Sequence, residues 1–243
     1  MINYKILTVI TVLSIAVFSC GQPEKETKQA EEKASDTTQK SYTPPHIETP
    51  DEAIAEIKAG NQRYLTGKLQ NTNIKEMIAN TSDDQHPFVA VLSCMDSRIP
   101  VEVVFDQGIG NMFVTRVAGN VADVNVLGSL EYATKVKGSK LIIVLGHNKC
   151  GAISGALDDV KLGNLTALLK QIKPAITLDS TGDKIKSANN TARRNVQLTM
   201  EEIHKKSPVM NELFKEGKLK MIGAYYDVTS GKIYFEEDLK KWW

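Results

Sequence analysis

The stretch from residue 87 to residue 98, PFVAVLSCMDSR, places three reactive side chains directly after an apolar run. Residues 87–93 are apolar and rich in β-branched side chains, as expected of a strand that is covered on both faces. Cys94, Asp96 and Arg98 follow at alternate positions, where this strand should end. A thiol, a carboxylate and a guanidinium so close together predict a chemical site at the end of a buried strand.

The rest of the chain repeats this strand pattern between helical patterns. Strand-like runs occur at 111–119 and 140–146, and two more surround the turn TSG within residues 219–237. Helices are expected at 50–65, 123–138, 151–160 and 191–207. Strands that alternate with helices predict an α/β fold, in which helices flank a mainly parallel sheet and sites form at the carboxyl ends of the strands.

The composition is that of an ordinary globular protein. A chain of 243 residues, 42% hydrophobic and 24% charged, fits one or two domains, and no internal repeat or second boundary is visible after residue 47. The net charge of +1 gives no electrostatic reason to expect nucleic acid as a partner. Three cysteines are too few for a disulfide framework, so each needs another explanation.

The first cysteine belongs to an export signal. The opening MINYKILTVITVLSIAVFSCGQ carries Lys5, then an apolar run from Ile6 to Phe18, then Cys20 between small residues. This run is shorter than the about 20 residues that a membrane span needs, and it fits the hydrophobic region of a secretory signal. A cysteine at the cleavage point resembles a bacterial lipoprotein signal. An ordinary signal peptide and an uncleaved anchor are the alternatives.

We therefore expect a signal peptide over 1–19, a lipidated Cys20, a disordered tether over 20–46 and a folded domain over 47–243. Glu, Lys, Gln, Ser, Thr and Pro dominate the tether, which has almost nothing that could enter a core. This arrangement predicts an exported lipoprotein that is anchored to a membrane through its lipid alone, on the periplasmic side or at the cell surface.

The two remaining cysteines fall at the ends of predicted strands. Cys94 follows the strand at 87–93, while His147 and Cys150, in the sequence HNKC, follow the strand at 140–146. Because parallel strands end in one crevice, these side chains should face the same ion. Zn²⁺ favours such a mixture of sulfur and nitrogen, and three protein ligands leave its fourth position open for chemistry. The alternatives are a redox pair, or buried cysteines that act as small apolar residues with His147 capping a helix.

Asp96 and Arg98 extend this interpretation. Asp96 is two residues from a predicted ligand, so it could bind the metal in a closed state or hydrogen-bond the oxygen at the open position. Arg98 could pair with Asp96 in fork geometry and hold it away from the metal. The alternative is a salt bridge that merely ends a strand and contributes little by itself.

CMDSR and HNKC, together with GNQRY, SLEYA and GAYYDVTSGKIYF in the same order, resemble the motifs of the β-class carbonic anhydrases. The resemblance covers roughly residues 50–236 and includes the family motifs C-x-D-x-R and H-x-x-C. It implies roles at the matching positions: zinc ligands at Cys94, His147 and Cys150, a gating pair of Asp96 and Arg98, and a substrate pocket with Gln85, Phe113 and Tyr132. Gly119 and Asn120 match a turn that we assign to shape rather than to catalysis.

The resemblance also implies what the chain does. The family activity is the reversible hydration of carbon dioxide to bicarbonate and a proton, with one Zn²⁺ per chain. Family members are homodimers or tetramers in which both protomers line each site, and the helix at 50–65 would be an arm on the neighbour. Two other functions are left open, namely hydrolysis of a heterocumulene such as carbonyl sulfide or carbon disulfide, and zinc binding by a non-catalytic lipoprotein.

Overall fold

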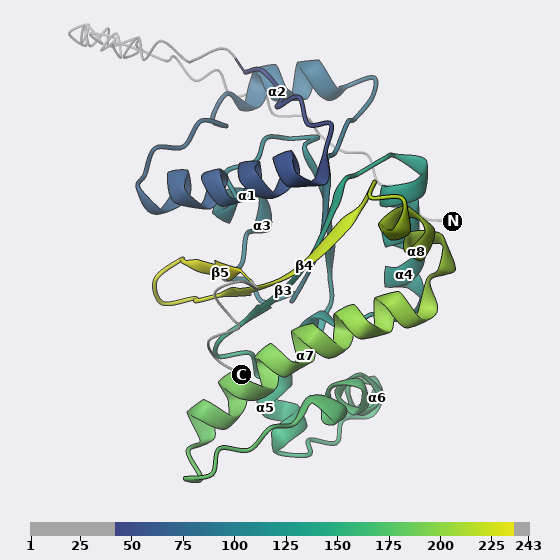
Figure 1. Ribbon diagram of the computed structural model, residues 1–243. Coiled ribbons are helices and arrows are strands. Elements are labelled where there is room, and N and C mark those ends of the chain that lie inside the picture. Colours follow the sequence, from purple (N-terminus) through teal and green to yellow (C-terminus); the bar gives the residue numbers. More distant parts are fainter. Residues whose placement is uncertain (1–41, 236–243) are drawn as a thin grey trace, which may run out of the picture. The chain divides into compact units, whose positions relative to one another are not determined.

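The structure, a computed structural model, describes residues 42–235 (Figure 1). The expected signal peptide at 1–19 and the lipidation site Cys20 lie outside the described residues, as does most of the expected tether. Among residues 42–235, none of the helices has the length and apolar character that crossing a membrane requires.

The packed domain begins earlier than the expected residue 47. The side chain of Tyr42 is buried, and its hydroxyl donates a 2.6 Å hydrogen bond to Asn111 Oδ1. The ring lies so close to Gly108 that a Cβ atom there would come within 2.7 Å of it. An aromatic residue that follows a long polar stretch therefore enters the core, and this corrects the tether boundary predicted at residue 46.

A five-stranded sheet with the strand order β2-β1-β3-β4-β5 forms the centre of the domain (Figure 1). Its strands are β1 (Val89–Ser93), β2 (Met112–Arg116), β3 (Leu141–His147), β4 (Lys220–Tyr226) and β5 (Ile233–Phe235). β1 to β4 pair in parallel with their neighbours, and only β5 is antiparallel, as the partner of β4. The prediction of a mainly parallel α/β sheet is confirmed.

Helices surround this sheet. They are α1 (Pro50–Leu65), α2 (Ile74–Thr81), α3 (Val101–Val104), α4 (Val124–Glu131), α5 (Gly151–Leu157), α6 (Gly163–Ile172), α7 (Lys184–Lys206) and α8 (Pro208–Lys215). Short 3₁₀ turns occupy η1 (Ala118–Asn120) and η3 (Lys173–Ala175), and a π-helical turn, η2 (Tyr132–Val136), ends the helix expected at 123–138. α7 begins before the expected residue 191 because the Asp183 side chain accepts hydrogen bonds from the first N–H groups of that helix.

The sheet separates two apolar cores because successive residues of a strand point to opposite faces. One core lies between the sheet and α1, α5 and α6, and it includes Cys94 and Cys150. The other lies between the sheet and α4 and α8, and Phe113 packs against it. Helix α7 contributes Ala192 to the first core and Val196 to the second.

Helix α1 begins as the sequence predicts. The Thr49 side chain accepts a hydrogen bond from the main-chain N–H of Glu52, and the Glu52 carboxylate accepts one from the N–H of Thr49, which forms a capping box. Ala53 and Ile57, on one face of the helix, are fully buried in the first core of the same chain. α1 is therefore packed against its own domain, and its opposite face is exposed.

Gly60 allows α1 to approach the loop after α3, since a Cβ atom at Gly60 would lie 1.8 Å from the carbonyl oxygen of Phe105. We expect Gly60→Ala to lower the free energy of unfolding by about 1–3 kcal/mol, the usual range for overpacking. The matched control is Gly128→Ala in α4, where the new Cβ would meet open space among residues 42–235 outside the helix's own backbone and alanine should stabilise by up to about 1 kcal/mol. Urea unfolding measures both changes, and equal stability of the two variants would contradict this packing.

Candidate metal centre

Cys94, His147 and Cys150 meet at the carboxyl ends of β1 and β3. Cys94 follows the last residue of β1, His147 is the last residue of β3, and Cys150 is the N-cap of α5. Their ligand atoms lie within 4.8 Å of one another, and all three residues are buried. Strands β1 and β3 are parallel neighbours, so their ends bring together side chains that are far apart in the sequence.

The imidazole of His147 has one nitrogen to offer a metal. Its Nδ1 lies 2.8 Å from the main-chain carbonyl oxygen of Asn148. Because a carbonyl oxygen can only accept, Nδ1 carries the proton and Nε2 carries the free lone pair. Nε2 is buried and has no hydrogen-bond partner among residues 42–235. A buried polar atom without a partner is costly, and coordination to a cation at the cluster would satisfy it.

The two thiols are also placed where they could share one cation. Their Sγ atoms are 3.9 Å apart in a buried environment. A hydrogen bond from Cys150, together with one from the N–H of Gly119, lowers the pKa of Cys94. The pKa of Cys150 is raised, because its proton is held by Cys94 and because the side chain is buried. Both sulfurs can be ionised together only beside a positive ion, and zinc fits this set of two sulfurs and one nitrogen.

Asp96 and Arg98 form the predicted fork beside this cluster. Arg98 Nε donates to Asp96 Oδ1 at 2.9 Å, and Arg98 Nη2 donates to Asp96 Oδ2 at 2.7 Å. These bonds from Arg98 lower the pKa of Asp96 to about 2, so its carboxylate is ionised at neutral pH. Arg98 Nη2 also donates to the carbonyl of Lys149 at 3.1 Å, which joins the pair to the loop between His147 and Cys150. Asp96 is thereby held by Arg98 rather than by the three-residue cluster.

Further residues that the sequence did not reveal support the ligands. Arg116, at the end of β2, donates to the main-chain carbonyls of Cys94 at 3.2 Å and of Asp96 at 2.5 Å. The N–H of Gly119 lies 3.4 Å from Cys94 Sγ, and Asn195 Nδ2 on α7 donates to the Gly119 carbonyl at 2.7 Å. The sequence pattern places Arg116 inside the strand expected at 111–119, whereas the observed strand ends at Arg116, and nothing in the sequence marks Asn195.

Gly119 does more than shape a turn. Its φ of 69° lies in the left-handed region, and a Cβ atom on it would come within 2.5 Å of Ile172 Cδ1. Only a glycine can therefore present this N–H to the Cys94 sulfur without displacing Ile172. Gly119 therefore shapes the turn, as predicted, and its N–H also contacts a predicted metal ligand.

Gln85, Phe113 and Tyr132 lie at the other end of the sheet. Phe113 pairs with Ala90, four residues before Cys94, which corresponds to about 13 Å along a strand. The Tyr132 ring lies 6.0 Å from the Phe113 ring in an edge-on arrangement.

Gln85 is exposed in the segment before β1, and the neighbouring Asp84 pairs with Lys137 just after η2. The structure therefore brings Phe113 and Tyr132 together, with the Gln85 segment at the same end of the sheet. Within one chain it does not bring these predicted pocket residues to the metal ligands.

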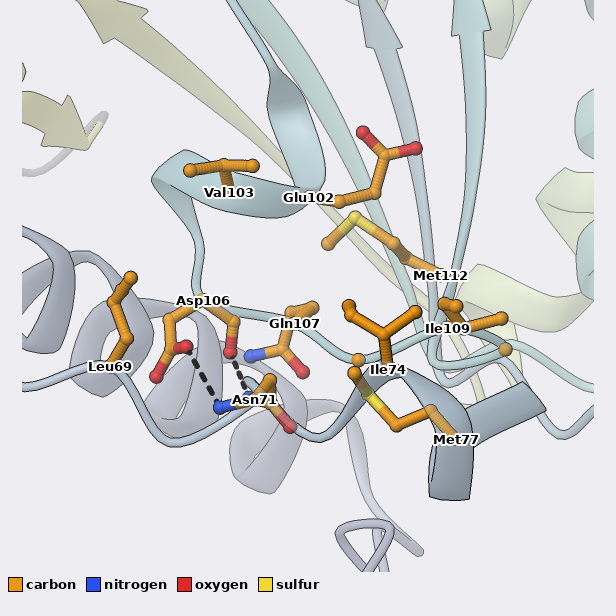
Figure 2. Close-up of a pocket in the computed structure, with 12 residues that line it drawn as sticks. Leu69, Asn71, Ile74, Met77, Glu102, Val103, Asp106, Gln107, Ile109 and Met112 are labelled. Atoms are coloured by element: carbon orange, nitrogen blue, oxygen red, sulfur yellow. Dashed lines mark hydrogen bonds between the residues drawn. The ribbon is translucent and has the colours of Figure 1, made fainter. Parts of the chain in front are cut away.

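A separate pocket of about 340 Å³ lies beside the edge strand β2 (Figure 2). Its walls come from the loop before α2, from α2 and α3, and from the segment leading into β2, and they are mostly apolar: Leu69, Ile74, Met77, Val103, Ile109 and Met112. At one side Asn71 bonds to Asp106, donating from its main-chain N–H and from its side-chain amide (Figure 2). None of the metal-ligand candidates lines this pocket, so it is not the metal centre.

The chain was compared with known proteins. A family model described as carbonic anhydrase matches residues 89–233. Carbonic anhydrase 2 of Mycobacterium tuberculosis is 32% identical over 189 residues, which cover 75% of this chain and 91% of the relative. The carbonic anhydrase of Mycolicibacterium smegmatis has the same identity and coverage.

Solved structures agree with these relatives. One solved relative is described among the crystal structures of two tetrameric β-carbonic anhydrases from Sordaria macrospora. It is 26% identical with a TM-score of 0.61, and the match covers 76% of this chain and 94% of that chain. The β-carbonic anhydrase CafA of Aspergillus fumigatus is 25% identical with a TM-score of 0.62, covering 79% of this chain and 95% of that chain. The protein therefore belongs to the β-class carbonic anhydrase family.

Proposed function

We propose that this protein catalyses the zinc-dependent, reversible hydration of carbon dioxide to bicarbonate and a proton. The observation that carries the proposal is the cluster of Cys94, His147 and Cys150, in which Nε2 of His147 is left free. When bound, zinc supplies the Lewis acidity that turns water into a nucleophile at neutral pH. A protein that only stored zinc would need the ligands alone, so the ordered pair of Asp96 and Arg98 beside them favours catalysis.

Asp96 is the group that would handle the reacting water. Its carboxylate has about four lone-pair directions, and the fork from Arg98 uses only part of them. The remaining capacity can accept a hydrogen bond from a water at the open position and orient its lone pair toward carbon dioxide. Arg98 keeps the carboxylate ionised and prevents it from turning to the metal, while its bond to the Lys149 carbonyl fixes the fork to the ligand loop.

Asp96→Asn tests this role directly. An asparagine keeps the size of the side chain but replaces one acceptor oxygen by an NH₂ group. Because Arg98 donates to both oxygens of Asp96, this NH₂ group would face a donor of Arg98. It also cannot accept a hydrogen bond from water. We expect one zinc per chain, as in the wild type, and a fall in hydration rate of about 100-fold or more. Elemental analysis gives the zinc content, and stopped-flow measurement with a pH indicator gives the rate.

The control for this variant is Asp159→Asn. Asp159 is also a carboxylate whose pKa is lowered to about 2, through Lys161 and Lys173, but it is exposed and outside the metal cluster. Its replacement should leave zinc content and hydration rate unchanged. Full activity of Asp96→Asn would defeat the role proposed for Asp96, and wild-type protein without stoichiometric zinc would defeat the proposed function as a whole.

We also propose that the active unit is a homodimer, or a tetramer built from such dimers, in which each chain completes the site of its neighbour. Gln85, Phe113 and Tyr132 lie at the end of the sheet opposite the ligands, so a second chain must supply them if they line the substrate pocket. The exposed apolar side chains of Ile74 and Val103, 53% and 48% exposed, flank the pocket beside edge strand β2 and offer a surface for it. The solved Sordaria relatives are described as tetrameric, which supports this assembly.

Mixed dimers test which chain supplies Gln85. A Cys94→Ser chain cannot complete its own metal centre but keeps Gln85, whereas a Gln85→Ala chain keeps its ligands. If Gln85 acts on the neighbouring site, co-expression of the two should restore one complete site in each mixed dimer and raise the hydration rate above that of either homodimer. The rate is measured on mixed dimers purified through two different affinity tags.

The matched control combines Cys94→Ser with Asp96→Asn. Cys94 and Asp96 belong to the same end of one chain, so this mixture contains no complete site and should not recover activity. Mixed dimers of Cys94→Ser and Gln85→Ala that form normally yet remain as slow as the homodimers would contradict the shared site.

We also propose that the protein is an exported lipoprotein whose folded domain lies outside the cytoplasm. The support for this proposal is the short apolar run that ends at Cys20 and the polar segment that follows. We expect the mature full-length protein to begin with a Cys20 that carries fatty acyl chains, with residues 1–19 removed. Mass spectrometry after growth with a labelled fatty acid measures this, with Cys20→Ser as the unlabelled control. A wild-type protein that retains residues 1–19, or an unmodified Cys20, would exclude the lipid anchor.

A further inference from the structure

The orientation of the His147 ring depends on a single carbonyl group. Its Nδ1–H donates to the main-chain oxygen of Asn148 at 2.8 Å, while Nε2 has no hydrogen-bond partner among residues 42–235. Because the ring pivots about its bond to Cβ, the position of that oxygen decides where the opposite nitrogen, Nε2, points. A shift of the Asn148 peptide would therefore turn Nε2 away from the sulfurs of Cys94 and Cys150.

Three hydrogen bonds hold Asn148 against the end of β4 and the turn that follows it. Its main-chain N–H donates to the carbonyl of Tyr226 at 3.2 Å. Its side-chain Nδ2 donates to Asp227 Oδ1 at 2.7 Å, and its Oδ1 accepts from the N–H of Val228 at 2.8 Å. Both ends of the side-chain amide are thus used, and they face one short segment of the chain.

The turn that receives Asn148 is itself well held. Asp227 Oδ1 also accepts from the N–H of Thr229 at 2.9 Å, and Oδ2 accepts from the hydroxyl of Ser230 at 3.0 Å. The Asp227 carbonyl accepts from the N–H of Gly231 at 2.8 Å, and its N–H donates to the carbonyl of Lys232. Asp227 is therefore fixed by its own turn and gives Asn148 a stationary acceptor.

The other half of the ligand loop has a separate support. Lys149 has a φ of 53°, in the left-handed region, and its carbonyl accepts from Arg98. That contact fixes the peptide between Lys149 and Cys150, whereas the bonds of Asn148 fix the residue whose carbonyl receives the imidazole. The described hydrogen bonds of the Asn148 side chain go to Asp227 and Val228 and not to a ligand atom, so its effect on the ligands passes through the main chain.

We propose that Asn148 is a positioning residue of the zinc centre, whose amide ties the carbonyl that orients His147 to Asp227 and Val228 in the turn between β4 and β5. This inference rests on the zinc site of the proposed function. Groups that orient a metal-binding histidine generally change metal affinity or activity about 10- to 100-fold when they are removed. The side chain of Asn148 does not bond to the imidazole. It holds in place the residue whose main-chain carbonyl accepts the hydrogen bond from the imidazole.

Replacement of Asn148 in the full chain should weaken zinc binding. Asn148→Ala removes both side-chain bonds, and Asn148→Asp places a second carboxylate against Asp227, so we expect each to lower zinc affinity about 10-fold or more. The double variant Asn148→Asp/Asp227→Asn removes the repulsion between two carboxylates and provides a donor at position 227, but the N–H of Thr229 then loses its acceptor. It should therefore bind zinc more tightly than Asn148→Asp and more weakly than the wild type.

Two measurements separate positioning from a loss of stability. Competition with a chromophoric chelator gives the zinc affinity, and the visible bands of the cobalt-substituted protein report the geometry of the ligands. We expect altered cobalt bands in Asn148→Ala and Asn148→Asp, and bands closer to those of the wild type in the double variant. Circular dichroism of the metal-free proteins shows whether each variant is folded before metal is added.

Asn211→Ala is the matched control, because it also removes two side-chain bonds from a half-buried asparagine. Asn211 Nδ2 donates to the His204 carbonyl at 2.6 Å, and its Oδ1 lies 3.0 Å from His204 Nδ1, at the junction of α7 and α8. This variant should keep wild-type zinc affinity and cobalt bands. An equal loss of affinity in Asn211→Ala would show a general effect of stability and would overturn the inference.

Wild-type affinity and bands in Asn148→Ala, or a double variant as weak as Asn148→Asp, would also overturn it. These results differ from a failure of the proposed function. A wild-type protein that binds neither zinc nor cobalt would remove the metal centre, and this inference with it, whereas normal metal binding by the wild type with an unchanged Asn148→Ala removes the inference alone.

Discussion

The balance of charge and hydrogen bonding among Cys94, His147 and Cys150 is the constraint on which the site depends. Two sulfurs 3.9 Å apart repel each other when ionised, and a buried nitrogen without a partner is costly. One cation satisfies all three groups, and the ends of β1 and β3 are rigid enough to keep them in place for it. The same strands are buried on both faces, so the centre rests on the most stable part of the sheet.

Around this cluster, main-chain groups do most of the positioning. The Gly119 N–H points at a sulfur, the Asn148 carbonyl orients the imidazole, and the Lys149 carbonyl receives Arg98. Side chains from more distant elements support two of these residues in turn. Asn195 on α7 donates to the Gly119 carbonyl, and Asp227 after β4 accepts from the Asn148 side chain. A site built in this way is sensitive to changes that touch no ligand, because each support acts through the backbone.

The sequence was sufficient to predict the strands and the ligands, since both depend on local patterns. A short apolar run rich in β-branched residues favours a buried strand, and parallel neighbouring strands place residues such as Cys94 and His147 at one edge of the sheet. Helices α2 and α6, and the burial of Tyr42, were not foreseen, because their polar or mixed segments are stabilised by contacts with distant residues. The pairing of Asn148 with Asp227 is of the same kind, since neither residue carries a signal of its partner.

If Gln85, Phe113 and Tyr132 line the substrate pocket, as we propose, their placement limits how copies of this chain can assemble. Each chain has a metal centre at one end of its sheet and these side chains at the other. In a pair related by a two-fold axis the contacts are reciprocal, so the chain that lends its Phe113 end to a neighbour receives the same from it. Both sites are then completed at once. A head-to-tail arrangement would complete the sites only along a ring or an open filament, and an open filament always leaves one incomplete site at its end. A two-fold dimer is therefore the smallest assembly in which no metal centre lacks its pocket.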